Sequence, residues 1–500
     1  MTHKFYITTT LPYVNAQPHM GHTLEFIQAD VIARWKRKQL WPQNIIFNVG
    51  TDEHGLKIFE KALETQEEKS ISEDQKIKIV KKFVNNNVQS FKDFCHLLNI
   101  SYDSFYRTSD PSHSDVAQSF RNASAAKGDI YKKMYSWYYC VGCESFKTPK
   151  ELTEDGVCPD HGKAPIKHEE ENYFFRLSKQ KDALLKHIQD NQDFIIPQSK
   201  RDELTNFVQD MNDISISRHK NNLPRGIPVP HDDQQVMYVR FDALTNYVGA
   251  IWYPQDQEKM QQFRPGIQLC WPDNLKFQGA IWQGMLASLG LPFSKSILIH
   301  GMIFGPDGNK MSKTLGNVIS PFDQVEKFGI EALRYYMIAG IPTYGDASYK
   351  EDDLINLYNA HLANSFGNLL NRLIHLANKK WISFPTVEQK DTSKIDSDIQ
   401  NRIIHTQHVV ATLYDSYDLY AASNNIHKFV LYTNKYLDEQ KPRDTSLPDA
   451  EVKETLLTVY YLLSTIIDLY TPIIPSSCAQ ANLMIQTQQP WILFQKIELT

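Results

Sequence analysis

Two histidines, His19 and His22, stand three residues apart on either side of Gly21 in the run PHMGH at 18–22. The run lies between a predicted strand and the helix that follows it, and a helix start presents backbone N–H groups that suit a phosphate. Gly21 has no side chain, so a nucleotide could approach the backbone closely there. Both imidazoles can donate hydrogen bonds to charge that develops on a phosphorus. These residues therefore predict a phosphate site, with a polar helix start as the alternative.

A second candidate for phosphate chemistry is the run KMSKT, which begins at Lys310 and follows GPDGN at 305–309. The two glycines of 305–309 give the approach to the run conformational freedom. Lys310 and Lys313 are three residues apart, and two mobile ammonium groups can hold a polyphosphate. The alternative interpretation is a basic surface loop.

A metal site is indicated by two short turns that contain cysteine. Cys140 and Cys143 are separated by two residues, and so are Cys158 and His161. Three thiolates and one imidazole at this spacing fit a tetrahedral zinc knuckle. Four protein ligands leave no open position for a catalytic water, so the zinc would be structural. The alternatives are unligated thiols or a knuckle that has lost its metal.

The elements that must position these residues begin with alternating strand and helix in the first region, 1–115. A β-rich run at 5–10 precedes a predicted helix at about 19–39, and a second strand is predicted at 44–49. This alternation predicts a parallel α/β unit. From 116–230 loops, cysteine-containing turns and a charged run replace the alternation, so this region is predicted to be an insertion.

The α/β pattern resumes in the third region, 231–350. Strands are predicted at 236–241 and 297–300, with a helix around 280–289 between them. The two α/β regions are therefore predicted to form one split domain.

The last region, 351–500, is predicted to be a helical bundle. Apolar residues recur there at steps of three and four residues, which marks one buried stripe. Two prolines, Pro472 and Pro475, are predicted to end the last long helix. The stripe consists of Leu354, Tyr358, Leu362, Phe366, Leu369, Leu373 and Leu376.

Composition narrows the class of protein. The chain has 500 residues, 42% hydrophobic and 22% charged, with a net charge of −5. This is ordinary for a globular protein of several domains and argues against disorder and collagen-like architectures. No apolar run is long enough to span a membrane, and six cysteines do not make a disulfide scaffold. We therefore expect a soluble, cytoplasmic protein without a membrane partner.

HMGH and KMSKT together resemble the HIGH and KMSKS motifs of class I aminoacyl-tRNA synthetases. Within that class the chain resembles the methionyl-tRNA synthetase family, from about residue 5 to about residue 475. The likeness rests on LPYVN at 11–15, GTDEHG at 50–55, the cysteine and histidine knuckle, DISISR at 213–218 and FDA at 241–243. KMSKTLGN, which ends at 317, is a close match.

The resemblance implies a fold and an activity. The fold would be a split Rossmann-type parallel sheet with a zinc-knuckle insertion, followed by an all-α bundle that binds the anticodon. The enzyme would ligate L-methionine to tRNA(Met) through a methionyl-adenylate, releasing pyrophosphate and AMP. It would use ATP with Mg²⁺ as substrate and hold one structural Zn²⁺. The chain ends soon after the bundle, so a monomer is expected.

The resemblance also implies roles for individual residues. His19 and His22 would contact the ATP phosphates beside Gly21, and Lys313 would stabilise the departing pyrophosphate with support from Lys310. Asp52 would accept the α-ammonium of the amino acid, with Asp273 near it, and Arg218 would complement acidic groups near the adenylate. Positions around the methionine side chain are matched by Leu11, Tyr13, Ala243, Tyr247, Phe277 and Trp282. Residues that read the anticodon are matched by Asn368 and Arg372, with Arg443 where a stacking Trp is usual.

The chain departs from the family pattern at four places. Arg240 replaces a Trp near the thioether pocket, where a buried cation without a partner would be costly. Trp271-Pro272 replaces a Gly-Lys pair, and Gln278 stands where a His is common. Arg443 is the fourth departure, although a guanidinium can also stack on a base.

Two other functions stay open at this point. A class I synthetase for another amino acid would carry the same two motifs. A diverged tRNA-binding paralogue that does not charge tRNA is favoured by Arg240, Trp271-Pro272 and Arg443, but such a binder has no need of HMGH and KMSKT.

Overall fold

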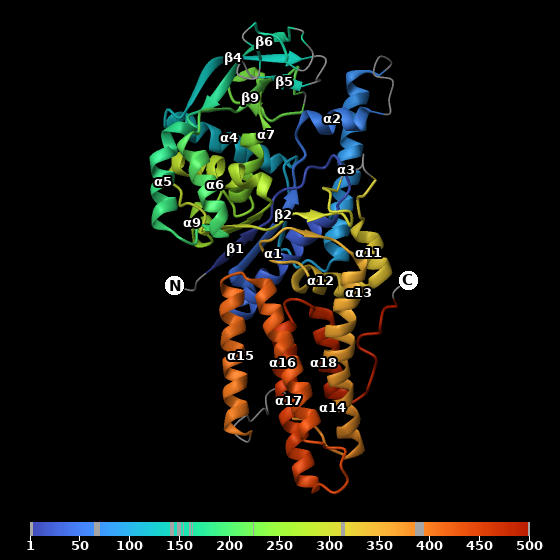
Figure 1. The fold of residues 1–500 in the computed structure, drawn as a ribbon. Coiled ribbons are helices and arrows are strands. Elements are labelled where there is room, and N and C mark those ends of the chain that lie inside the picture. Colours follow the sequence, from blue (N-terminus) through green and yellow to red (C-terminus); the bar gives the residue numbers. More distant parts are fainter. Residues whose placement is uncertain are drawn as a thin grey trace.

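The computed structural model describes residues 4–64, 71–140, 145–147, 152–153, 155–159, 162, 164–223, 225–311, 316–385 and 395–498. At 135–140, 145–147 and 166–168 it describes the backbone alone. Figure 1 shows an α/β part, coloured blue to yellow, above a bundle of orange and red helices. Within the described ranges, no helix is both long enough and apolar enough to cross a membrane.

The α/β part is built on a six-stranded sheet in which all neighbouring strands run parallel. Its two central strands come from the two halves predicted to form one split domain, and Ile7 pairs with Ile267 between them. The carboxyl ends of parallel strands meet at one edge, where ligands bind in such folds. The strand order is β3 (Ser104–Arg107), β2 (Ile45–Thr51), β1 (Phe5–Thr8), β12 (Ile267–Cys270), β13 (Ser296–Ile299) and β7 (Ile195–Ile196).

The helices of the α/β part cover both faces of this sheet (Figure 1). The first of them, α1, is buried on all sides along its first half, because the sheet lies on one side and α12 (Ile330–Ala339) on the other. The longer helices are α1 (Met20–Leu40), α2 (Leu56–Leu63), α3 (Glu73–Leu97), α4 (Pro111–Ala126), α5 (Lys181–Asp190), α6 (Gln198–Gln209), α10 (Trp282–Leu289) and α11 (Pro321–Phe328). Short helical turns are α7 (Val239–Asp242), α8 (Asn246–Gly249), α9 (Gln257–Gln262), η1 (Pro42–Asn44), η4 (Leu177–Gln180), η5 (Ala243–Thr245), η6 (Pro272–Asn274) and the π-helical η7 (Phe277–Ile281).

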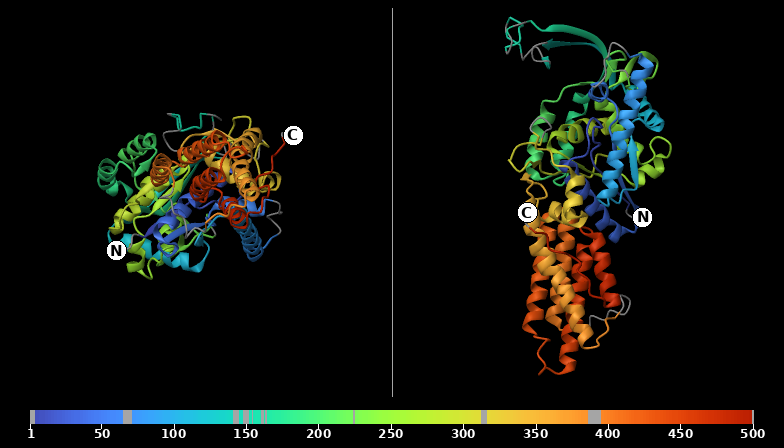
Figure 2. Two further views of the ribbon diagram at one scale, coloured as in Figure 1. Left: turned by 90° about the horizontal axis from the view of Figure 1, so that it is seen from below. Right: turned by 90° about the vertical axis from the view of Figure 1, so that its right-hand side faces the viewer.

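The region predicted to be an insertion carries one antiparallel sheet of its own and forms a second one with the first strand of the region that follows it. The right view of Figure 2 shows its long teal hairpin standing away from the rest of the molecule. One sheet has the order β5 (Ser145–Lys147), β4 (Ile130–Cys140), β6 (Ile166–Phe175) and β8 (Ile214–Ser215). The other has the order β10 (Pro228–Val229), β11 (Asp232–Met237) and β9 (Ser217–His219). The region also supplies β7 to the parallel sheet, so the chain returns to the central sheet within it.

The strand predicted at 236–241 was wrong in its second half. Strand β11 ends at Met237, and the next residues form the short helix α7. This turn carries Asp242 to a buried position beside His54, which a continued strand would not do.

The bundle confirms the predicted helical stripe, whose seven residues are all buried. Pro475 begins the last helix rather than only ending the one before it, because proline suits the first turn of a helix. The helices are α13 (Glu351–Tyr358), the π-helical η8 (Asn359–Gly367), α14 (Asn368–Lys379), α15 (Ser397–Asp415), α16 (Leu419–Glu439), α17 (Asp449–Tyr470) and α18 (Pro475–Thr487). The parallel pair β14 (Ile303–Phe304) and β15 (Ala347–Ser348) lies where the chain leaves the α/β part.

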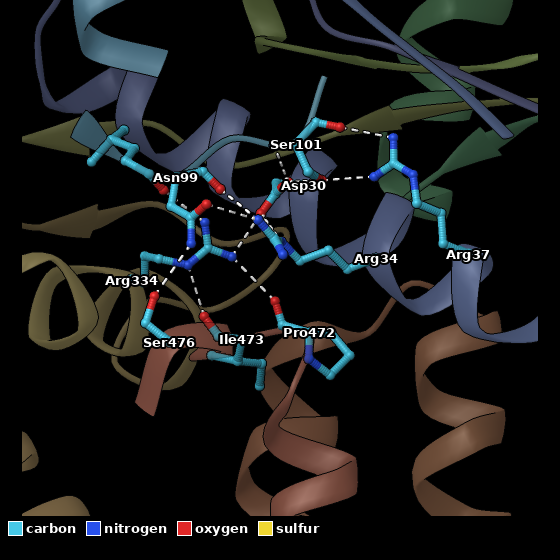
Figure 3. Close-up of polar contacts among 10 residues, drawn as sticks. Asp30, Arg34, Arg37, Asn99, Ser101, Arg334, Pro472, Ile473 and Ser476 are labelled. Carbon is cyan, nitrogen blue, oxygen red and sulfur yellow. Dashed lines mark hydrogen bonds and ion pairs between the residues drawn. The ribbon is translucent and has the colours of Figure 1, made fainter. Parts of the chain in front are cut away.

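The bundle and the α/β part share one continuous apolar core, which runs from β1 and α1 through α12 into α14, α16 and α17. At this junction the buried guanidinium of Arg334, on α12, lies beside Asp30 of α1 (Figure 3). Arg334 also donates to the backbone carbonyls of Pro472 and Ile473, which precede α18. The two parts are therefore joined by a polar network as well as by apolar packing.

Candidate active site

The HMGH run begins α1, and its two histidines cap the helix. The N–H of Gly21 donates to Nδ1 of His19 over 3.2 Å, and the N–H of His19 donates to Nδ1 of His22, also over 3.2 Å. The two rings lie 3.9 Å apart between centroids. The sequence suggested free backbone N–H groups at this turn, but the imidazoles occupy two of them.

This capping fixes what the imidazoles can offer a ligand. Each Nδ1 accepts a hydrogen bond, so each neutral ring carries its proton on Nε2 and can donate from there. Burial lowers the pKa of His19 to about 4. Burial and the neighbouring imidazoles His19 and His300 lower the pKa of His22 well below its usual value. At neutral pH both side chains are therefore neutral donors rather than cations.

The loop of the second motif approaches the same end of the sheet. The backbone of Lys310 forms an isolated antiparallel β-bridge with that of Phe304. The Nζ of Lys310 lies 3.3 Å from Oδ2 of Asp273. Asp307 accepts hydrogen bonds from Asn309 and Asn317, which ties the two sides of the loop together. Lys313 lies outside the described residues, so the geometry of this motif rests on Lys310.

A group of buried carboxylates lies at the ends of β1 and β2. The backbones of Asp52 and Tyr13 form an isolated parallel β-bridge, and Oδ1 of Asp52 accepts a hydrogen bond from the N–H of His54 over 3.3 Å. Nδ1 of His54 lies 3.0 Å from Oδ2 of Asp242. Burial first, and then the charge of Asp242, raise the pKa of Asp52 well above its usual value. A cationic ligand beside Asp52 would stabilise the ionised carboxylate and so lower this pKa again.

Aromatic side chains make up most of the predicted methionine pocket. Tyr247 and Trp282 are buried with ring centroids 5.7 Å apart, and Nε2 of Gln278 donates to the hydroxyl of Tyr247 over 2.5 Å. Phe277 and Ala243 are partly exposed. Arg240 is exposed and lies over the ring of Phe277 at 6.0 Å and over that of Tyr238 at 5.5 Å. The burial cost expected for this cation therefore does not arise.

The remaining residues assigned to the amino-acid site lie around this group. Leu11 approaches Gly50 at the end of β2, and the hydroxyl of Tyr13 lies directly against Gly55. Arg218 lies over the ring of Tyr238 at 4.1 Å and donates to the hydroxyl of Ser215. Asp273 is exposed beside Lys310, outside the buried carboxylate group.

The predicted zinc ligands fall largely outside the described residues. Cys143 and His161 are not described, and Cys140 is described in its backbone only, as the last residue of β4. Cys158 is buried, and the N–H of Gly162 donates to its carbonyl over 2.8 Å. Among side chains that the structure describes, no group of three or more potential metal ligands occurs.

The candidate anticodon residues lie on the bundle. Asn368 begins α14 and is exposed. Arg372, one turn later, forms an ion pair with Asp438 of α16. Arg443 is exposed in the connection that follows α16. The structure therefore brings Arg372 beside the helix that leads to Arg443.

Three polar residues of the site received no role from the sequence. His54 and Asp242 stand inside motifs that were recognised, so their pairing could have been suspected from the motifs alone. His300 directly follows β13 at the ligand edge of the sheet, and its Nε2 lies 3.2 Å from Oε2 of the buried Glu25. A polar residue at the carboxyl end of a parallel strand was the available signal.

Comparison with known proteins gives a consistent result. The family model described as tRNA synthetases class I (M) matches residues 5–164 and 148–374, and one described as anticodon-binding domain of tRNA ligase matches 396–492. The methionine–tRNA ligase of Caldanaerobacter subterraneus subsp. tengcongensis is 38% identical over 447 residues, which cover 88% of this chain and 67% of that relative. The ligase of Thermosynechococcus vestitus is 35% identical over 487 residues, covering 95% of this chain and 88% of the relative.

Solved structures agree with these relatives. Methionyl-tRNA synthetase of Mycobacterium tuberculosis in complex with methionyl-adenylate superposes with a TM-score of 0.83 at 30% identity, covering 96% of this chain and 93% of that one. The family models, the curated relatives and the solved structure therefore all point to one family and cover most of this chain. The chain belongs to the methionyl-tRNA synthetase family of class I aminoacyl-tRNA synthetases.

Proposed function

We propose that this chain ligates L-methionine to its tRNA in two steps. In the first, a carboxylate oxygen of methionine attacks the α-phosphorus of ATP, and the bond from that phosphorus to the β-phosphate oxygen breaks to release pyrophosphate. In the second, a ribose hydroxyl of the tRNA attacks the carbonyl carbon of the methionyl-adenylate and AMP leaves. The observation that carries the proposal is the buried carboxylate Asp52 at the sheet edge where the neutral donors of HMGH begin α1.

The phosphate chemistry is assigned to the two motifs. The Nε2–H groups of His19 and His22 would donate hydrogen bonds to phosphate oxygens. Because both imidazoles are neutral, the site avoids the cost of burying two cations side by side. Lys313 would meet the charge that develops on pyrophosphate, and Lys310 would position the loop through Asp273. ATP would arrive as its Mg²⁺ complex.

The amino group of methionine is assigned to Asp52. An α-ammonium placed beside Asp52 would stabilise the ionised carboxylate, whose pKa is raised by burial and by Asp242. The thioether would lie among Tyr247, Trp282 and Phe277, because a flexible, polarisable chain packs well on aromatic rings. Leu11, Tyr13 and Ala243 would complete this pocket, with Arg218 near the adenylate.

A structural zinc in the insertion is part of the proposal. Cys140 ends a strand whose register pairs it with Ser145 of β5, and the carbonyl of Cys158 accepts from the N–H of Gly162, so both positions suit a knuckle. Cys143 and His161 would supply the other two ligands. Replacing Cys140 and Cys143 by Ser should remove about one zinc per chain and destabilise the insertion before the ATP site, because a closed four-ligand site contributes folding energy. Wild-type protein prepared without chelator that contains no zinc would exclude this site.

The bundle is proposed to bind the anticodon of tRNA(Met) through Asn368, Arg372 and Arg443. Side chains one helical turn apart share a face and can reach bases that are turned out of a loop. Action as a cytoplasmic monomer stays a prediction, which sedimentation velocity and cell fractionation would test.

Pyrophosphate exchange tests the proposed function directly. Labelled pyrophosphate should enter ATP in the presence of methionine and not of the other nineteen common amino acids, without any tRNA. Exchange with a different amino acid would assign the chain to another substrate. Absence of exchange with all of them, together with retained tRNA binding, would favour a binding paralogue.

A further inference from the structure

Trp271 covers the part of the HMGH turn that has no side chain. It follows β12 at the ligand edge of the sheet, and its six-membered ring lies against Gly21. A Cβ added to Gly21 would stand 2.0 Å from Cη2 of the indole and 2.7 Å from Cζ3. The space opened by this glycine is therefore filled by Trp271.

The indole also contacts the imidazoles proposed to bind phosphate. Its centroid lies 5.6 Å from that of His19 and 5.7 Å from that of His22, with interplanar angles of 85° and 71°. On another side it lies 5.6 Å from His300, whose ring Glu25 holds in place. Edge-to-face contacts of this kind are favourable, so the indole is packed rather than loosely placed.

The backbone confines any movement of Trp271 to its side chain. Trp271 precedes Pro272 and has φ −74° and ψ 158°, the extended conformation that a following proline favours. The side chain is partly exposed, so rotation about its own bonds can carry the indole toward solvent.

We propose that the indole of Trp271 occupies the place of the nucleotide on Gly21 and that ATP must displace it. The proposal rests on the proposed function, because that function brings a purine nucleoside triphosphate to Gly21, His19 and His22. The nucleotide and the indole require the same surface of Gly21 and cannot both fill it. Trp271 thus acts as an internal competitor that weakens the apparent affinity for ATP.

Removal of the indole should therefore tighten ATP binding. An indole packed for about nine-tenths of the time raises the apparent Kd for ATP about tenfold. Trp271→Gly and Trp271→Ala should lower the KM for ATP in methionine-dependent exchange by about that factor, with the KM for methionine unchanged. The control Trp41→Ala removes an exposed indole far from the turn in sequence and should change neither constant. An unchanged or increased KM for ATP in both Trp271 variants would overturn the proposal, and an increase would make the indole a stacking wall instead.

Fluorescence tests the displacement without requiring activity. The difference between the emission of the wild type and that of Trp271→Phe reports this indole alone, and Phe keeps an aromatic ring in the site. Titration with a non-hydrolysable ATP analogue should move the difference spectrum to longer wavelength as the indole enters water. A difference spectrum that the saturating analogue leaves unchanged would overturn the proposal. Failure of the proposed function looks different, because methionine-dependent exchange would then be absent from the wild type and from every Trp271 variant alike.

Discussion

Replacement of Arg334 by Met should be among the most destabilising single changes in this chain. Figure 3 shows its guanidinium between the α/β part and the bundle, where Nη2 lies 2.7 Å from Oδ2 of Asp30 and Nη1 lies 2.9 Å from the carbonyl of Leu98. The carbonyls of Pro472 and Ile473 accept from the same group at 3.1 and 2.8 Å. Both charged side chains of the pair are fully buried. The variant therefore leaves a buried carboxylate and three buried carbonyls short of donors.

The magnitude follows from what remains at Asp30. Breaking a buried ion pair by removing one partner costs about 3–5 kcal/mol. Nε of Arg34 still donates to Oδ2 of Asp30 at 2.7 Å, and Ser101 still donates to Oδ1, so we expect the lower end of that range. Lys38→Met is the matched control on α1. It breaks an exposed ion pair with Asp468 of α17 at the same junction, outside the Asp30 network, and such pairs contribute about 0–1 kcal/mol.

Urea unfolding followed by circular dichroism would measure both losses. A double-mutant cycle with Asp30→Asn isolates the pair, because the double variant should lose less free energy of unfolding than the sum of the two single variants. Burial raises the pKa of Asp30, but Arg334 and Arg34 outweigh burial and hold it below its usual 3.8. The contribution of Asp30 is thus present above about pH 3.8 and is lost as the pH falls through the lowered value. Strictly additive losses, or an Arg334→Met variant as stable as Lys38→Met, would refute the reasoning.

Three further outcomes are expected from the proposed site. Burial and Asp242 raise the pKa of Asp52, and ammonium binding needs the ionised carboxylate, so the KM for methionine should rise as the pH falls. Asp242→Asn should move that rise to lower pH. A pH profile of exchange that is the same in Asp242→Asn and in the wild type would contradict this. Lys313→Ala should slow adenylate formation about a hundredfold to a thousandfold in single turnovers, with methionine affinity unchanged. Arg443→Ala should lower tRNA charging about tenfold to a hundredfold and spare exchange, whereas Arg443→Trp should retain charging; unchanged charging at sub-saturating tRNA would make Arg443 a solvated surface residue.

Local patterns in the sequence predicted the elements that depend on local physics. The apolar stripe from Leu354 to Leu376 fixed the buried face of α13, η8 and α14, because helical spacing alone determines which residues share a face. The HMGH turn was correctly placed between β1 and α1. The family resemblance is confirmed by the comparisons over most of the chain.

Contacts between distant segments were beyond the reach of the sequence patterns. Strand β12 has only four residues, too few to show a period, yet it lies in the centre of the sheet. The run at 236–241 is apolar enough for a strand, but its second half turns into α7, which places Asp242 beside His54 of a distant segment. The pairing of Arg334 with Asp30 joins two helices far apart in the chain, and nothing local to either residue announces it.

The departures from the family pattern that change the residue type most are not those with the most contacts to the two motifs. Arg240 and Arg443 change the character of their positions strongly, but both are exposed, so each is solvated and neither strains the fold. Trp271-Pro272 looks milder, yet this segment touches both phosphate motifs, since Trp271 lies on Gly21 and the next acidic residue, Asp273, contacts Lys310. The substituted pair thus stands in a short segment that contacts HMGH through Trp271 and KMSKT through Asp273. Of these departures, we therefore expect the one at the end of β12 to change the affinity for ATP most.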